Sequence, residues 1–172
     1  MEVFLTPEIV DAYLEMCLGT AVLRYPAVQA ACRKCRTLKI TSSYADEMKD
    51  LTIPIDLVLK GIQKEGFHGS KKLRMAFTQV NRIFLIAMWD VLKTTETYSK
   101  ISTEKEIQFL RHIRNGCAHH NKFDIREKIE HPAQWRDKKI VESMNGSPVI
   151  PDFLFDGDVY LLLHDINNRY FK

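Results

Sequence analysis

The stretch that decides the fold is "KKLRMAFTQVNRIFLIAMWDVLK", residues 71–93, the clearest periodic segment of the chain. Its apolar residues recur every three or four positions, which is the spacing of one face of an α-helix. They are Leu73, Ala76, Phe77, Val80, Ile83, Phe84, Ala87, Met88 and Val91. A stripe this broad predicts a long helix that is buried on one side and lies at the centre of the fold.

Three more helices are predicted before this segment. Thr6 and Pro7 have the pattern of an N-cap followed by proline at the first helical position, and the apolar spacing of residues 9–22 continues that helix. A second helix is expected after Pro26, and a shorter one over residues 55–64, closed by Gly66. The inner side of the second helix is expected to carry Val28, Ala31, Cys32 and Cys35.

The C-terminal half predicts two further helices and one hairpin. Residues 103–106 have the pattern of a capping box, and a helix follows them, whereas the last helix is expected to begin near Asp156 or Asp158. Between the two, the turn signal Asn145-Gly146 predicts a small β-hairpin near residues 139–150. The fold class is therefore all-α, a single helical bundle of about five to six helices.

Composition places the chain among globular proteins with one domain. It has 172 residues, of which 45% are hydrophobic and 27% charged, enough for one core over residues 1–172. The longest apolar run, residues 83–89, is far shorter than the roughly 20 residues that cross a membrane. The first residues lack the basic and small-residue pattern of a signal peptide, so we expect no membrane partner and a cytoplasmic location.

We expect no cofactor, and the spacing of the cysteines agrees with this expectation. Cys32 and Cys35 form a lone CxxC without the second ligand pair that a structural zinc site needs, so we expect them to be buried as reduced thiols. No metal site is predicted. A net charge of +3 permits a nucleic-acid partner without requiring one.

The most reactive side chains gather in "RNGCAHH", residues 114–120, at the predicted end of the helix that follows the capping box. Ile107, Leu110, Arg114 and Cys117 follow the spacing of one inner stripe. Arg114 therefore falls where the helix turns inward, and a guanidinium there must find an anion or hydrogen-bond acceptors.

The spacing of this motif leaves two interpretations open. Asn115 shares a helix face with both Arg111 and His119, because each pair is four residues apart. On an unbroken helix Arg114 and His119 would point about 140° apart, and Gly116 offers a place to break the helix and bring them together. The alternative is a frayed helix end, whose arginine and histidine only complement the helix dipole.

A charged segment follows the motif. Lys122, Arg126, Lys128, Arg136, Lys138 and Lys139 are interleaved with Asp124, Glu127, Glu130 and Asp137. Mixed charge of this kind is typical of a solvated face. Its position directly after the motif also makes Lys122, Arg126 and Arg136 candidates for RNA binding, with Trp135 as a surface on which a base could stack.

Arg114, Asn115 and His119, at a helix end in an all-α chain, resemble the motif of the HEPN superfamily. "HPAQWRDKKI" (residues 131–140) and "YLLLHDI" (residues 160–166) resemble a plasmid- and phage-defence-associated branch of that superfamily. The resemblance implies a HEPN-like domain, a metal-independent endoribonuclease that acts as a homodimer. It also implies a toxin or anti-phage or anti-plasmid defence effector, with an antitoxin or defence-system protein as a possible partner.

The predicted chemistry uses the 2′-hydroxyl of RNA as nucleophile. His119 would transfer a proton, Arg114 would stabilise the charged phosphate, and Asn115 would orient the histidine or hold a phosphate oxygen. A second histidine would come from the other subunit, or from His120, with Arg111 as a further auxiliary residue. Two alternatives stay open: a module that binds RNA or a nucleotide without cutting it, and a partner-binding scaffold subunit.

Overall fold

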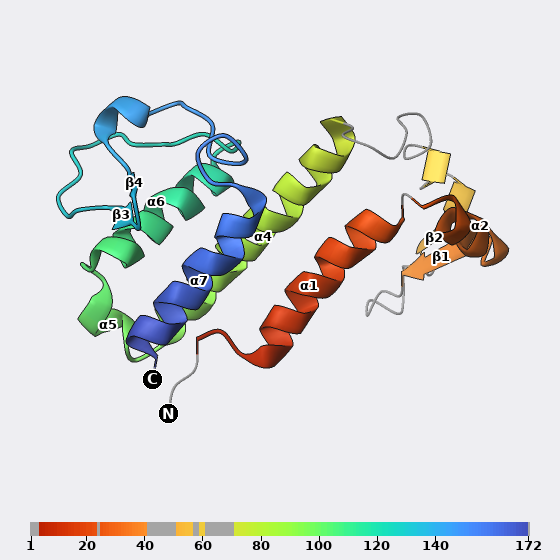
Figure 1. The fold of residues 1–172 in the computed structure, drawn as a ribbon, viewed down its shortest axis with the longest axis horizontal. Coiled ribbons are helices and arrows are strands. Elements are labelled where there is room, and N and C mark those ends of the chain that lie inside the picture. Colours follow the sequence, from red (N-terminus) through yellow and green to blue (C-terminus); the bar gives the residue numbers. More distant parts are fainter. Residues whose placement is uncertain (1–3, 24, 41–50, 57–58, 61–70, 172) are drawn as a thin grey trace. The chain divides into compact units, whose positions relative to one another are not determined.

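The structure is a computed structural model that describes residues 4–23, 25–40, 51–56, 59–60 and 71–171 (Figure 1). It is mostly helical with small antiparallel sheets, so the predicted fold class is confirmed. The chain divides into two compact units: Met1–Leu14 with Phe77–Lys172, and Glu15–Ala76. The single domain over residues 1–172 stays a prediction. None of the helices in the described part of the chain is long and apolar enough to cross a membrane.

The first unit contains the C-terminal helices. It holds α5 (Tyr98–Ile101), α6 (Lys105–Ala118), α7 (Asp156–Tyr170) and most of α4 (Lys71–Thr94), together with the start of α1 (Pro7–Val22). α6 contacts both α7 and the short strand β3. The side chains of Ile107, Phe109, Leu110 and Ile113 from α6, and of Val159, Leu162, Leu163 and Ile166 from α7, are fully buried. The last helix begins at Asp156, as predicted.

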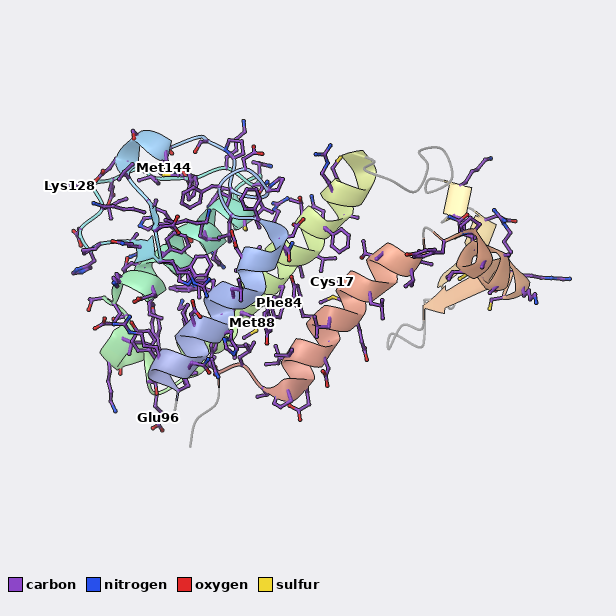
Figure 2. The ribbon with its side chains drawn as sticks, in the orientation of Figure 1. Cys17, Phe84, Met88, Glu96, Lys128 and Met144 are labelled. Carbon is purple, nitrogen blue, oxygen red and sulfur yellow. The ribbon has the colours of Figure 1, made fainter. Side chains whose placement is uncertain are left out.

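The long helix α4 is confirmed, but its buried face is rotated from the predicted one. Ile83 and Val91 from the predicted stripe are 62% and 37% exposed. Among residues 74–94 of the helix, the buried side chains are Thr78, Asn81, Phe84, Leu85, Met88, Trp89 and Leu92 (Figure 2 labels Phe84 and Met88). Phe84 and Met88 belong to the predicted stripe, but apolar spacing does not predict the rest of this face, which also buries an asparagine and a threonine.

Asn81 is buried because two other helices satisfy its amide. Its Oδ1 accepts a hydrogen bond from the Tyr13 hydroxyl at 2.5 Å, and its Nδ2 donates one to Asp156 Oδ1 at 2.6 Å. Tyr13 also stacks on Phe84, with ring centroids 4.2 Å apart. The amide therefore joins α1, α4 and α7, and a buried amide without such partners would be costly.

Of the two helix N-caps predicted from the sequence, one is confirmed and one is wrong. Thr6 caps α1 as predicted, because its Oγ1 accepts a hydrogen bond from the Ile9 amide at 3.4 Å. The capping box at residues 103–106 is wrong: Glu104 is the N-cap of α6 and its side chain makes no cap hydrogen bond to a described residue. Glu106 is instead drawn to α7, where it accepts hydrogen bonds from Arg169 at 2.7 Å and Tyr170 at 2.9 Å.

The predicted hairpin exists, but it lies earlier in the chain. β3 (Gln134–Trp135) pairs antiparallel with β4 (Lys138–Lys139), so the turn is at residues 136–137. Asn145 and Gly146 instead follow a short 3₁₀ helix, η1 (Glu142–Met144), and Gly146 adopts the left-handed φ of 81° that favours glycine.

The second unit contains α2 (Pro26–Lys34) and the antiparallel strands β1 (Thr37–Ile40) and β2 (Leu51–Pro54), which sequence periodicity does not predict. The predicted burial of Cys35 is wrong, since this side chain is exposed, and Ala31 is exposed as well. Cys32 is half-buried. Residues 55–56 and 59–60 are helical, whereas the rest of the predicted helix 55–64 and Gly66 lie outside the described residues.

We predict that Asn81→Ala lowers the free energy of unfolding of the first unit by about 1–3 kcal/mol, because it removes both buried hydrogen bonds. The matched control is Asn168→Ala on the exposed side of α7, which should change stability by less than about 0.5 kcal/mol. Denaturation followed by tryptophan fluorescence suits this test, since both tryptophans, Trp89 and Trp135, belong to the first unit. Equal effects of the two substitutions would contradict the role of the Asn81 network.

Candidate active site at the end of helix α6

The helix that carries the motif does not break at Gly116. α6 continues to Ala118, and the amide of His119 still donates to the carbonyl oxygens of Asn115 and Gly116, at 2.9 and 3.1 Å. The prediction that Gly116 interrupts the helix is therefore wrong. The chain reverses only afterwards, where His120 and Asn121 have left-handed φ angles of 57° and 62°. Such angles are uncommon for residues other than glycine, so the surrounding structure must hold them.

Asn121 provides most of that support. Its Oδ1 accepts a hydrogen bond from the Ile150 amide at 3.2 Å, its Nδ2 donates to the Ile150 carbonyl at 2.5 Å, and its own carbonyl accepts from the Val149 amide at 3.0 Å. Gly116 allows the same approach, since a Cβ there would lie 2.5 Å from Val149 Cγ2 and 3.1 Å from the carbonyl oxygen of Lys122. Residues 120–122 are thereby fixed against residues 149–150.

The end of α6 is capped by another helix. Arg82 of α4 donates from Nε to the carbonyl oxygen of Cys117 at 2.8 Å, and from Nη2 to the same oxygen. Cys117 itself is fully buried. Burial raises the pKa of the Cys117 thiol to about 12, although the charge of Arg82 opposes this change. The thiol therefore stays protonated at neutral pH and does not act as a nucleophile.

Arg114 lies on the side of α6 that faces α4. Its guanidinium is half-buried, and its Nη2 lies 3.7 Å from Asp90 Oδ1, which is an ion pair without hydrogen-bond geometry. The Nε atom is buried, and no atom of the described residues accepts a hydrogen bond from it. Arg114 therefore keeps one buried donor, Nε, without an acceptor among the described residues.

His119 points to a carboxylate instead. Its side chain is 53% exposed, and its Nε2 lies 3.5 Å from Asp124 Oδ2. Asp124 Oδ1 accepts a hydrogen bond from Arg126 Nε at 2.9 Å. That hydrogen bond is the main cause that lowers the pKa of Asp124, with smaller effects from the charges of Arg126 and His119. Asp124 is thus a carboxylate at neutral pH and would pair with a protonated His119, whereas the neighbouring His120 is an exposed residue.

A polar pocket of about 320 Å³ adjoins this pair. One wall is a face of α6, formed by Gln108, Arg111, His112 and Asn115, and the other is the segment of residues 124–131, on which Figure 2 labels Lys128. The pocket thus brings together three predicted residues, namely Arg111, Asn115 and Arg126. Arg114 and His119 are not among its lining residues, although Asp124, which contacts His119, is.

Sequence reasoning misses two residues of this site. In the sequence Asp124 is one of several acidic residues in a charged segment, and only the chain reversal shows that it reaches His119. His112 is half-buried in the pocket wall, and its pKa is lowered mainly by burial and then by the charge of Arg111, while Glu142 opposes the change. The signal that could have found it is spacing, since His112 precedes Asn115 by three residues and His119 by seven.

Two predicted RNA-binding residues have other contacts. Trp135 is only 2% exposed, and its Nε1 donates a hydrogen bond to Asp165 Oδ2 at 3.0 Å. The prediction that its ring stacks on an RNA base is therefore wrong for this structure. Arg136 pairs with the same oxygen at 2.9 Å and lies over the indole ring. Lys122 is exposed beside the motif and remains open to solvent.

Among the described residues, no group of three or more histidine, cysteine, aspartate or glutamate side chains is placed to hold a metal ion. Comparison with known proteins provides no further assignment. No family model, no curated protein sequence and no solved structure matches the chain.

We predict that Gly116→Ala destabilises the first unit by about 1–3 kcal/mol, because the new methyl group must displace Val149 or the backbone at Lys122. The matched control is Gly157→Ala in α7, where no described heavy atom lies within 4 Å of the place that the alanine Cβ would take. Alanine should be neutral there or stabilise the helix by up to about 1 kcal/mol. Denaturation followed by tryptophan fluorescence compares the two, and a stabilising Gly116→Ala would show that the close approach does not exist.

Proposed function

We propose that this chain is a metal-independent endoribonuclease that cleaves RNA by attack of the 2′-hydroxyl, with His119 as a proton-transfer residue. The observation that carries the proposal is the contact of an exposed His119 with the Asp124 carboxylate, beside a polar pocket lined by Arg111 and Asn115. Histidine suits proton transfer near neutral pH, and an adjacent carboxylate can orient the ring and balance its charge.

The surrounding cations support RNA as the substrate. Arg111 and Lys128 line the pocket, and Lys122 is exposed next to the motif. Arginine and lysine bind phosphate groups through charge-assisted hydrogen bonds. Asn115 lies on the pocket wall, where its amide can hold a phosphate oxygen. Arg126 contributes indirectly, because it holds the carboxylate that contacts His119.

The position of Arg114 supports the homodimer that the HEPN resemblance implies. Since α6 is helical through Ala118, Arg114 and His119 point roughly 140° apart within one chain. Arg114 is half-buried and, among the described residues, makes only a 3.7 Å ion pair with Asp90, so its outer guanidinium nitrogens could bind a phosphate held by a second subunit. A two-fold dimer would place Arg114 of one chain near His119 of the other. In the cytoplasm such an enzyme would serve as a toxin or defence effector, restrained by an antitoxin or another partner protein.

We predict that His119→Ala lowers the rate of RNA cleavage by about 10²–10⁴-fold, the range for loss of a general acid or base. Arg114→Ala should also abolish detectable cleavage, because it removes charge stabilisation of the phosphate. Cleavage of bulk RNA by purified protein, analysed on a denaturing gel, measures both. The control is His164→Ala, an exposed residue of α7 that should cleave at the wild-type rate and preserve the circular dichroism spectrum.

Three outcomes of that experiment would change the assignment. If His119→Ala cuts normally and His120→Ala does not, His120 is the catalytic histidine. If the wild-type protein binds RNA without cutting it, the domain is a binding module. If neither binding nor cutting occurs and expression of the wild-type chain does not slow growth, a scaffold role replaces the enzyme.

We also predict that cleavage continues in EDTA at the wild-type rate, because histidine, arginine and the 2′-hydroxyl together provide the whole reaction. The measurement is a time course with and without chelator, using protein that was dialysed against EDTA beforehand. Loss of activity that magnesium or zinc restores would contradict the mechanism and make Asp124 and His119 candidates for metal ligands instead.

A further inference from the structure

Cleavage of RNA through the 2′-hydroxyl needs two proton transfers, and His119 performs only one of them. A base must take the proton from the hydroxyl, and an acid must give one to the departing 5′-oxygen. The pocket beside His119 contains a second histidine, His112, on the same helix. We propose that His112 is the general base for the 2′-hydroxyl and acts with His119 of the same chain; this inference rests on the proposed ribonuclease function.

Sequence spacing places His112, in α6, and His119, the C-cap residue of α6, on roughly the same side of the helix. They are seven residues apart, which on a regular helix means a rotation of only about 20° and a rise of about 10 Å. Asn115 lies between them, and it lines the pocket together with His112. Asp124, which contacts His119, forms part of the opposite wall. Both histidines therefore adjoin the pocket, His112 in its wall and His119 through its contact with Asp124, so a phosphate bound there could be approached by both rings.

The surroundings of the two rings suit different roles. His112 is half-buried beside Arg111, and these two influences lower its pKa, so that its ring is neutral and can accept a proton at pH 7. His119 is more exposed, and its contact with Asp124 provides a counter-charge for the protonated ring. His131 also lines the pocket, but it is exposed and belongs to an irregular segment rather than to a helix that fixes its position.

The reaction balances with these two residues alone. His112 removes the proton of the 2′-hydroxyl while that oxygen forms a bond to phosphorus. The bond between phosphorus and the 5′-oxygen breaks, and protonated His119 gives its proton to that oxygen. The products are a 2′,3′-cyclic phosphate and a 5′-hydroxyl, and proton exchange with water restores both histidines. Arg111 and Asn115 would hold the phosphate between the rings.

The two roles can be separated with a pair of RNA oligonucleotides that span a cleavage site mapped on bulk RNA. One has the natural 5′-oxygen at the scissile bond, and the other has sulfur in its place. A thiolate leaves without a proton because a thiol is far more acidic than an alcohol. The sulfur substrate therefore needs the base but not the acid. The variants are His112→Ala, the polar substitution His112→Gln, His119→Ala and the exposed control His164→Ala.

We expect both His112 variants to lose about 10²–10⁴-fold on both oligonucleotides. His119→Ala should lose as much on the oxygen substrate but cut the sulfur substrate within about tenfold of wild type. Circular dichroism and melting curves show whether each variant folds. If His112→Ala does not fold, the conclusion rests on His112→Gln.

Wild-type cleavage rates for His112→Gln would overturn the assignment of His112 as base. Normal cleavage of the sulfur substrate by His112→Gln would overturn it as well. A wild-type protein that leaves bulk RNA intact, so that no cleavage site can be mapped, would instead overturn the proposed function.

Mixing the two inactive variants tests whether both histidines belong to one chain. If they do, subunit exchange between His112→Ala and His119→Ala chains restores nothing, because no chain contains both residues. If the residues act across a two-fold interface, half of the randomly paired dimers regain one of two centres, and about one quarter of the wild-type activity returns. Recovery of that size would overturn the single-chain arrangement.

Discussion

The close packing of Gly116 against Val149 and the backbone of Lys122 is the contact on which the site depends. Because position 116 has no Cβ, the chain that leaves α6 can fold back directly over the helix from which it came. The reversal returns Asp124 to the end of the helix, where it meets His119. A side chain at position 116 would push this return path outward. The carboxylate therefore reaches the imidazole through a packing constraint, not through their separation of five residues in the sequence.

The spacing of apolar residues predicts where the long helices lie in the sequence. α4, α6 and α7 lie where the apolar spacing places them, and the start of α7 at Asp156 follows from that spacing. The buried face of α4 cannot be predicted in the same way. It includes Asn81, a residue that apolar patterns assign to the surface, and the Asn81 amide is satisfied there by Tyr13 and Asp156. Tertiary hydrogen bonds of this kind have no local signal.

In the candidate site, too, local spacing predicts some features, whereas tertiary contacts determine others. A spacing of four residues predicts that Asn115 and Arg111 share one face, and both line the pocket. For Trp135, residue type and charged neighbours suggest an exposed ring, but its indole is buried and bonded to Asp165. The cations of that segment are also largely neutralised, since Arg126 and Arg136 each already pair with a carboxylate. Their pairing lowers the net positive charge that an RNA phosphate would meet, so the cations without a carboxylate partner matter more for binding.

Arg114 and His119 lie at the C-terminal end of α6, but their side chains do not cap the helix. Cations often serve at this end of a helix because they complement its dipole and bind its last carbonyl groups. In this chain Arg82 of α4 fills that role through the carbonyl of Cys117. Arg114 and His119 are turned away from the helix axis, toward Asp90 and Asp124. A buried donor left unsatisfied at Arg114 Nε costs on the order of 1–3 kcal/mol. This unsatisfied donor argues against a purely stabilising role for Arg114 at the end of the helix.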